Sequence, residues 1–156
     1  MTIKKLNFKY RYLTLLFSII ATLLLFNMPP TTMAQSLVPR EQIEAIVVRQ
    51  ARAWENQDAK AIANDFAEDA LFVAAGFEFE GKQKIEQAAK DYFRGVERTT
   101  VTIKNIIIEE NKGAVEWDWR DLTKAGKEGF AEDAIVFELA EGKIIYWREY
   151  IEKKKP

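Results

Sequence analysis

The sequence predicts an α+β domain in which helices from its first half pack on a curved antiparallel sheet built from its second half. Two observations support this fold class. Apolar residues recur at helical spacing in three segments between residues 40 and 95. From residue 100 onward, apolar and polar residues alternate in runs divided by turn residues, as in β-strands. Helices followed by strands, rather than alternating with them, indicate a segregated α+β domain, and 156 residues suffice for one such domain with a core.

Three helices are expected in the first half. The first spans about 40–55, and its apolar face contains Ile43, Ile46, Val47, Gln50, Ala51 and Trp54. The second is short, starts after Asp58, whose side chain is a favourable N-cap, and ends near Ala67. The third follows Gly81 and ends near Gly95, because glycine is common at the end of a helix.

Five strands are expected. A short strand at 71–73 lies between the second and third helices. Four long strands follow, at 100–110, 114–123, 129–139 and 143–152. The turns that join them are expected at 111–113, 124–127 and 140–142. Turns this short connect neighbouring strands into an antiparallel meander.

Residues 1–34 are expected to be a signal peptide, and residues 35–156 the folded domain. Basic residues without acids precede an apolar run of 14 residues, 13–26, and Thr32-Met33-Ala34 provides small residues for cleavage. The run is shorter than the roughly 20 residues that cross a bilayer, so an uncleaved anchor is the less favoured alternative and no stable span is expected after cleavage. The chain has no cysteine, which excludes disulfides. We therefore expect export to a bacterial periplasm or the exterior.

Charge and composition exclude several functional classes. Residues 35–156 retain 19 of the 23 basic residues and all 24 acidic residues, a net charge of −5. Nucleic-acid binding needs a basic surface and is not expected. The chain has no histidine, which excludes Ser-His-Asp catalysis and histidine-ligated zinc. Acid–base chemistry must then use carboxylates, Lys, Tyr or Arg. No sequence motif indicates a cofactor, so none is expected.

The last predicted hairpin places two acids on an apolar face. If Ala140-Glu141-Gly142 forms a three-residue loop, Leu139 pairs with Lys143. Asp133 then lies opposite Glu149. The other members of that face are Ile135, Phe137, Ile145, Trp147 and Ile151. Acids in such surroundings are expected to face a cavity rather than bulk solvent.

The segment VEWDWRD, residues 115–121, alternates between apolar and charged side chains, and its register decides which of them face the cavity. If Ala125-Gly126 is a two-residue turn, Asp118 lies opposite Asp133, and Glu116 and Arg120 share its face. This register is favoured. Trp117 and Trp119 would then lie on the outer face, where large apolar rings indicate a homodimer interface. A slip of one residue reverses the assignment, with the tryptophans in the cavity and the acids in solvent.

Asp118 and Glu149 are the candidate acid–base pair, with Asp133 as the acid that tunes their protonation. Burial and mutual repulsion raise the pKa of at least one such acid, which keeps a carboxylic acid protonated beside a carboxylate base. Two alternatives remain open. Arg120 or Arg148 could neutralise a purely structural network, or the acids could hold a hard cation such as Ca²⁺, although no dedicated calcium loop is present and no metal is expected. The expected ligand contacts are Glu116, Arg120, Trp54, Phe72, Ile135, Phe137 and Trp147.

Three segments resemble the SnoaL-like families of the nuclear-transport-factor-two-like superfamily. They are WENQD (54–58), FAEDA (66–70) and EGKIIYWREY (141–150). The resemblance covers roughly residues 40–152 and implies a cone-shaped fold, with a deep apolar pocket between the helices and a bent sheet that often mediates dimerisation. Such families include polyketide cyclases, ketosteroid isomerases, epoxide hydrolases and non-catalytic binding domains.

The limonene-epoxide hydrolases have the most similar enzyme pattern. When this sequence is aligned with their Arg-x-Asp motif, Asp118 takes the position of the first catalytic acid. With their Trp-Arg-Asp-Tyr motif, Glu149 takes the position of the second. Glu116 occupies the arginine position, so the cation that bridges the acids is missing unless Arg120 replaces it. The base of ketosteroid isomerases would fall near Ala74, which cannot act as one. The leading hypothesis is an exported domain that binds a small, partly apolar molecule over carboxylates and uses them for hydrolysis or isomerisation. The alternative is a non-catalytic ligand-binding or dimerisation module.

Overall fold

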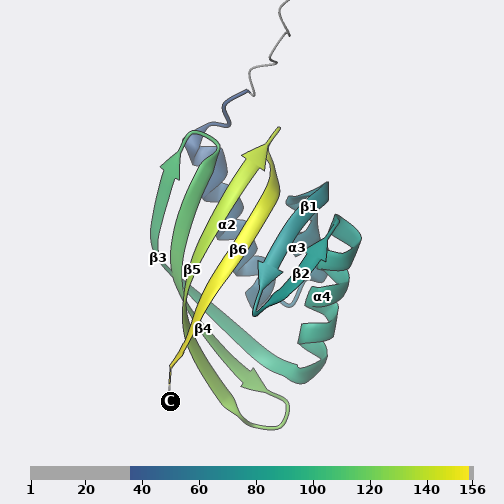
Figure 1. Ribbon diagram of the computed structural model, residues 1–156. Coiled ribbons are helices and arrows are strands. Elements are labelled where there is room, and N and C mark those ends of the chain that lie inside the picture. Colours follow the sequence, from purple (N-terminus) through teal and green to yellow (C-terminus); the bar gives the residue numbers. More distant parts are fainter. Residues whose placement is uncertain (1–35, 155–156) are drawn as a thin grey trace, which may run out of the picture. The chain divides into compact units, whose positions relative to one another are not determined.

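Residues 36–154 are described by a computed structural model, and the predicted signal peptide lies outside them. The helices are α2 (Arg40–Glu55), α3 (Ala59–Asn64) and α4 (Lys82–Gly95). The strands are β1 (Phe66–Ala74), β2 (Phe77–Glu80), β3 (Val96–Glu109), β4 (Lys112–Thr123), β5 (Glu128–Ala140) and β6 (Lys143–Lys154). The helices lie on one side of a curved sheet (Figure 1). Within residues 36–154, every helix is too short or too polar to span a lipid bilayer.

The strands form one sheet in the order β2-β1-β6-β5-β4-β3. Strands β1 and β6 are parallel, and the other neighbouring pairs are antiparallel. The predicted α+β class and the meander of four long strands are confirmed. The short strand predicted at 71–73 is part of the longer β1. Its partner β2 was missed, because a strand of four residues gives little periodic signal.

The predicted helices form for the expected reasons. Helix α2 buries Ile43, Ile46, Val47, Gln50, Ala51, Ala53 and Trp54 on the face toward the sheet. Asp58 caps α3, because its Oδ1 accepts a hydrogen bond of 2.9 Å from the backbone N of Ala61. Helix α3 ends at Asn64, earlier than predicted, because Phe66 already pairs with Ile144 of β6.

The core lies between the helices and the inner face of the sheet, which is the face toward the helices. Every second residue of β5 contributes to it. These residues are Ala131, Asp133, Ile135, Phe137 and Leu139. They pack with buried side chains of α2 and α4, such as Ile46 and Ile85. Asp133 is the one polar residue among these five inward-facing positions.

The β5–β6 hairpin differs from the predicted register. Its turn has two residues, Glu141 and Gly142, with φ angles of 52° and 74°, so Ala140 pairs with Lys143. Ile145 is then an extra residue in β6, where the pairing shifts between Glu138 and Leu139. Beyond this bulge, the side chains of β6 face the predicted sides of the sheet. Each β6 residue, however, lies opposite a β5 residue that is two positions away from its predicted partner.

As a result, Asp133 lies opposite Ile151, and Ile135 lies opposite Glu149. The prediction that Asp133 and Glu149 lie directly opposite each other was wrong. The two acids nevertheless share the inner face as diagonal neighbours. Such positions have Cα atoms roughly 7 to 8 Å apart.

The β4–β5 hairpin also differs from the prediction, and here the faces are exchanged. Leu122 pairs with Glu128, and the backbone N of Thr123 donates a hydrogen bond of 2.9 Å to the carbonyl O of Lys127. The loop is therefore longer than the predicted two-residue turn, and the register differs by one residue. Trp117, not Asp118, lies opposite Asp133. Because side chains alternate with period two, the tryptophans of β4 face inward and its acids Glu116 and Asp118 face outward.

A contact with α4 holds this longer loop. Nζ of Lys124 donates hydrogen bonds to the carbonyl oxygens of Phe93 at 3.3 Å and Arg94 at 2.9 Å. The backbone N of Lys124 donates to the carbonyl of Gly95. These carbonyls belong to the last turn of α4, where a cation is favourable.

Candidate functional site

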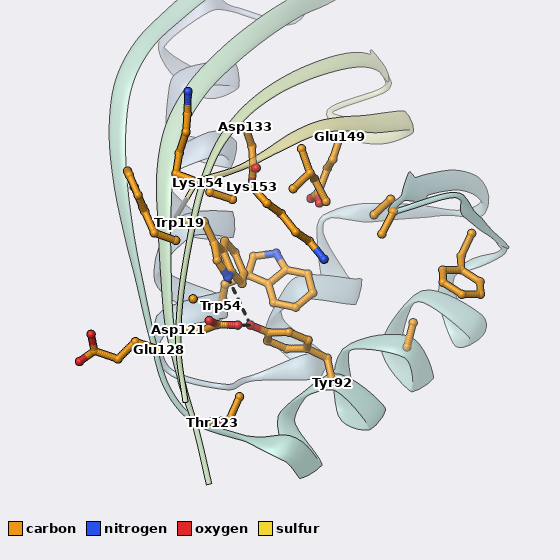
Figure 2. Close-up of a pocket in the computed structure, with 18 of the residues that line it drawn as sticks. Trp54, Tyr92, Trp119, Asp121, Thr123, Glu128, Asp133, Glu149, Lys153 and Lys154 are labelled. Carbon is orange, nitrogen blue, oxygen red and sulfur yellow. Dashed lines mark hydrogen bonds between the residues drawn. The ribbon is translucent and has the colours of Figure 1, made fainter. Parts of the chain in front are cut away.

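A cavity of about 650 Å³ lies between the inner face of the sheet and the helices (Figure 2). Its size is typical of small-molecule sites. Its walls are mainly apolar and include seven aromatic residues, and its polar groups are carboxylates, lysines and the hydroxyl groups of Tyr92 and Thr123. The principal lining side chains are Trp54, Phe72, Phe79, Tyr92, Trp119, Asp121, Asp133, Glu149 and Lys153.

The structure brings part of the predicted site together at this cavity. Asp133, Glu149, Trp54 and Phe72 lie on its wall, as predicted. Three further predicted contacts are buried in the core and do not reach the cavity. These are Ile135, Phe137 and Trp147.

The placement of Asp118, Glu116 and Arg120 in the cavity was wrong. The β4–β5 register turns all three to the outer face. There Oδ2 of Asp118 lies 3.3 Å from Nζ of Lys104, and the guanidinium of Arg120 stacks 4.2 Å from the ring centroid of Phe130. The expected row of three acids does not form. Asp118 is therefore not a partner of Glu149, and Arg120 does not bridge the acids.

Asp133 is buried in an environment that opposes its negative charge. Its side chain is 6% exposed, and its Oδ2 accepts a hydrogen bond of 3.2 Å from Nε1 of Trp117. Its Oδ1 is buried and has no hydrogen-bond partner among residues 36–154. Burial raises the pKa of Asp133 to about 6, and the hydrogen bond from Trp117 limits the rise.

Glu149 has a parallel arrangement on β6. Its Oε1 accepts a hydrogen bond of 3.0 Å from Nε1 of Trp147. Burial raises the pKa of Glu149 to about 8. The hydrogen bond from Trp147 opposes this rise, and the negative charge of Asp133 adds to it. In the part of the chain that the structure describes, neither acid has a Lys or Arg within ion-pair distance, so the alternative in which Arg120 or Arg148 neutralises the acids is not observed. Between about pH 6 and 8, an Asp133 carboxylate therefore lies beside a protonated Glu149.

A second polar cluster occupies the other end of the cavity. Nε1 of Trp119 donates a hydrogen bond of 3.2 Å to Oη of Tyr92, and Oη of Tyr92 donates one of 3.0 Å to Oδ2 of Asp121 (Figure 2). Burial, followed by the negative charge of Asp121, raises the pKa of Tyr92 well above its ordinary value. Tyr92 is therefore a fixed donor to Asp121 at neutral pH.

Sequence reasoning missed Asp121 as a site residue. In the favoured register, Asp118 faces the cavity and Asp121 faces solvent. In the alternative register, Asp121 faces the cavity. The glycine opposite Asp121 across the sheet, Gly129, is a sequence feature that could have indicated this. A Cβ atom at Gly129 would overlap Oδ1 of Asp121, so a larger residue there would displace that carboxylate.

The four tryptophans of the chain form one continuous series of ring contacts along the cavity and core. Trp54 lies 5.4 Å from Trp119, Trp119 lies 6.3 Å from Trp117, and Trp117 lies 5.8 Å from Trp147, measured between ring centroids. Tyr92 packs edge-to-face on both Trp54 and Trp119. Such contacts hold the rings in fixed orientations. The aromatic series connects the two polar ends of the cavity.

The described residues contain no group of three or more acids, histidines or cysteines positioned to hold a metal ion. The arrangement instead consists of two carboxyl groups with separated pKa values at one end, and a hydrogen-bonded carboxylate at the other. Groups of this kind can transfer protons and recognise polar atoms inside an apolar cavity.

Comparisons with known proteins agree with this fold. A protein from Catenulispora acidiphila with a ketosteroid isomerase-like fold, solved in complex with trimethylamine, has a TM-score of 0.64 and 21% identity, over 67% of this chain and 83% of that one. A candidate SnoaL-like polyketide cyclase from Jannaschia has a TM-score of 0.64 and 17% identity, over 76% and 92%. An epoxide hydrolase of the limonene-epoxide hydrolase type from Mycobacterium tuberculosis has a TM-score of 0.64 and 18% identity, over 72% and 84%.

At these identities the solved structures establish the fold alone. The comparison with curated proteins gave no match. The family model described as SnoaL-like domain matches residues 47–147, which form most of the domain described above. The chain therefore belongs to the SnoaL-like domain family.

Proposed function

We propose that the domain binds a small, partly apolar molecule in the cavity and transfers protons on it with Asp133 and Glu149. One observation carries the proposal. Two neighbouring carboxyl groups on the cavity wall have raised pKa values of about 6 and about 8, with no basic residue of 36–154 within ion-pair distance. Separated pKa values of this kind let one acid act as the base and the other as the proton donor near neutral pH.

Each indole fixes one oxygen of a carboxyl group. Trp117 holds Oδ2 of Asp133 and so orients the carboxylate, whose Oδ1 is buried and has no hydrogen-bond partner among residues 36–154. Trp147 holds Oε1 of Glu149, which leaves the other oxygen to carry and donate its proton. Asp133 removes a proton from a carbon while Glu149 protonates an oxygen of the same molecule, which gives an enol. Asp133 then returns its proton to a different carbon as the enol returns its proton to Glu149, and this completes an isomerisation that needs no cofactor and restores both groups.

A second candidate function is ligand binding without catalysis. Carboxylates without an ion-pair partner, in a cavity with several aromatic side chains, suit an amine-bearing ligand. The complex of the similar Catenulispora protein with trimethylamine supports this alternative. In that case the raised pKa values would set the charge of the pocket rather than catalyse a reaction.

Export and dimerisation are part of the proposal. The composition of residues 1–34 supports export through a cleaved signal peptide.

The predicted dimer interface at Trp117 and Trp119 was wrong, because both side chains face inward. Exposed apolar side chains on the outer face support a different homodimer surface. They are Ile107, Val136 and Tyr150, which are 62%, 42% and 57% exposed. Light scattering of the parent and of Val136→Lys tests it, and a parent that is a monomer would contradict it.

A ligand screen followed by isotope exchange tests the catalytic proposal. A thermal-shift screen at pH 5 and 7.5 identifies compounds that stabilise the parent. Each hit is then incubated with the protein in D₂O. Proton transfer on carbon incorporates deuterium, and both Asp133→Asn and Glu149→Gln should abolish it, whereas Asp118→Asn should not. Binding without exchange or turnover would favour the non-catalytic alternative, and the absence of any hit would contradict the proposal.

A further inference from the structure

We infer that Asp121 forms a second polar subsite in the same cavity and that this subsite binds a cationic amine group of the ligand. The inference rests on the proposed function in one respect, namely that the cavity holds a small molecule. It does not require that the domain be catalytic.

Asp121 is held in place but not neutralised. Tyr92 donates a hydrogen bond to its Oδ2, and Oδ1 lies over Gly129, where a larger residue would displace it. No Lys or Arg among residues 36–154 lies within ion-pair distance of this carboxylate. Asp121 is partly buried and lines the cavity. A charge-assisted hydrogen bond from an ammonium group would supply the missing partner.

The rings beside Asp121 favour the same ligand chemistry. The planes of Trp54 and Tyr92 meet at 82°, and those of Trp54 and Trp119 meet at 72°. Their centroid distances of 5.8 and 5.4 Å make the three rings one compact cluster. Faces of Trp and Tyr attract cations electrostatically, and the effect is larger where water is excluded. An anionic group at this end would be repelled by Asp121.

The strand register gives the spacing between the two subsites. Asp121 lies opposite Gly129, which precedes Asp133 by four residues on β5. At about 3.4 Å per residue, the two acids are about 14 Å apart along the sheet. In Figure 2, Asp133 and Glu149 lie at one end, Asp121 and Tyr92 at the other, and Trp54 and Trp119 between them. The ligand is therefore elongated, with its amine at Asp121 and its other end at Asp133 and Glu149.

Lys153 is a competing cation within the same cavity. It lies opposite Ala131 on the inner face, between the levels of Asp133 and Asp121, and it lines the cavity without an ion-pair partner in the described part of the chain. Its positive charge opposes a cationic ligand. Replacing Lys153 with Met should therefore strengthen amine binding, whereas replacing Asp121 with Asn should weaken it.

Isothermal titration calorimetry with two matched probes tests the inference. The probes are 4-phenylbutylamine and 4-phenylbutanol, which have similar shapes and differ in charge at pH 7. The parent should bind the amine about tenfold more tightly than the alcohol. Asp121→Asn should lose this preference and retain the affinity for the alcohol, while Lys153→Met should increase the preference.

The variants are chosen to keep the fold and to separate the possible failures. Asn at 121 still accepts the hydrogen bond from Tyr92, and an unchanged near-UV circular dichroism spectrum verifies the fold. Gly129→Ala adds a Cβ atom on the neighbouring strand β5 that displaces the carboxylate of Asp121. This variant should therefore also lose the preference for the amine over the alcohol. A preference that survives both changes and disappears in Asp133→Asn would overturn the inference. Equal affinity for both probes in the parent would also overturn it and leave the proposed binding function intact, whereas the absence of binding to either probe would contradict both.

Discussion

The indole of Trp117 and the carboxylate of Asp133 lie opposite each other on β4 and β5 and share a hydrogen bond of 3.2 Å from Nε1 to Oδ2. Trp147 and Glu149 repeat this pairing within β6 at 3.0 Å. Each acid of the proposed pair thus has one oxygen fixed by a neutral donor. A neutral N–H group orients a carboxylate without supplying the positive charge that would lower its pKa strongly.

Removing the indole donor should raise the pKa of Asp133. In Trp117→Phe the hydrogen bond that favours the charged form is absent, so the pKa should rise above about 6. Carbon-13 NMR of the side-chain carboxyl groups measures it directly. The matched variant Trp147→Phe should instead raise the pKa of Glu149 above about 8. An unchanged pKa of Asp133 in Trp117→Phe would contradict the assigned cause.

The two acids should make the domain less stable as the pH rises. Their pKa values are higher in the folded state, about 6 and about 8, than the ordinary values of 3.8 and 4.5. Between these limits the folded state binds more protons than the unfolded state, so the free energy of unfolding falls with increasing pH. Each unit of pKa difference corresponds to about 1.4 kcal/mol.

Urea unfolding at pH 4.5, 6, 7.5 and 9 measures this dependence. The contribution of Asp133 and Glu149 is the difference between the parent and the double variant Asp133→Asn/Glu149→Gln, which carries neutral side chains of nearly the same shape. The double variant should gain stability relative to the parent as the pH increases. A constant difference over the whole range would show that neither pKa is raised.

Asp118 should be dispensable. It lies on the outer face in a surface ion pair with Lys104, and such pairs contribute about 0 to 1 kcal/mol. Asp118→Asn should therefore change the free energy of unfolding by less than about 1 kcal/mol and leave ligand affinity unchanged. Thermal unfolding with and without a screening hit measures both quantities. A loss of affinity comparable to that of Asp133→Asn would mean that the observed register is incorrect.

Gly113 should not tolerate a side chain. A Cβ atom there would overlap the ring of Phe137 and lie 2.6 Å from the carbonyl O of Ile107, which belongs to the backbone and cannot move aside. Gly113→Ala should destabilise the domain by about 1–3 kcal/mol in urea unfolding. Gly95→Ala is the control. A Cβ atom at Gly95, in α4, meets nothing within 4 Å, so this change should be neutral or stabilise by about 0.5–1 kcal/mol.

Asn111 should control the segment that precedes α2. Its Oδ1 accepts a hydrogen bond of 2.7 Å from the backbone N of Val38, and its Nδ2 donates one of 3.0 Å to the carbonyl O of Ser36. Asn111→Ala removes both bonds and should cost about 1–3 kcal/mol. Limited proteolysis should then cleave residues 36–39 faster than in the parent. Asn105→Ala, at an exposed position, should leave the cleavage rate unchanged.

Local patterns predicted the elements of this fold well. The apolar spacing of Ile43 to Trp54 was sufficient for α2, and the side chain of Asp58 was sufficient for the start of α3, because both signals act within a few residues. The alternation of β5 and β6 also identified Asp133 and Glu149 as acids on an apolar face. These features depend on the chain near each residue and on little else.

The pairing of the strands depended on distant residues. Lys124 binds the last turn of α4, and this tertiary contact selects a loop that differs by one residue from a tight turn. The prediction for Asp118 failed for this reason, and Asp121 was missed for the same reason. Its partner Tyr92 lies on α4, so the cluster forms only when helix and sheet are packed. A residue pattern in one strand contains no information on such contacts.

The unbroken series from Trp54 through Trp119 and Trp117 to Trp147 has an optical consequence. These are the only four tryptophans in the sequence, so all tryptophan emission of the protein originates from rings that line the cavity or lie in the core next to it. Rings this close exchange excitation energy, and a change at one end alters the light emitted by all of them. The domain thus has a built-in fluorescent reporter of whatever enters it, and no label has to be attached.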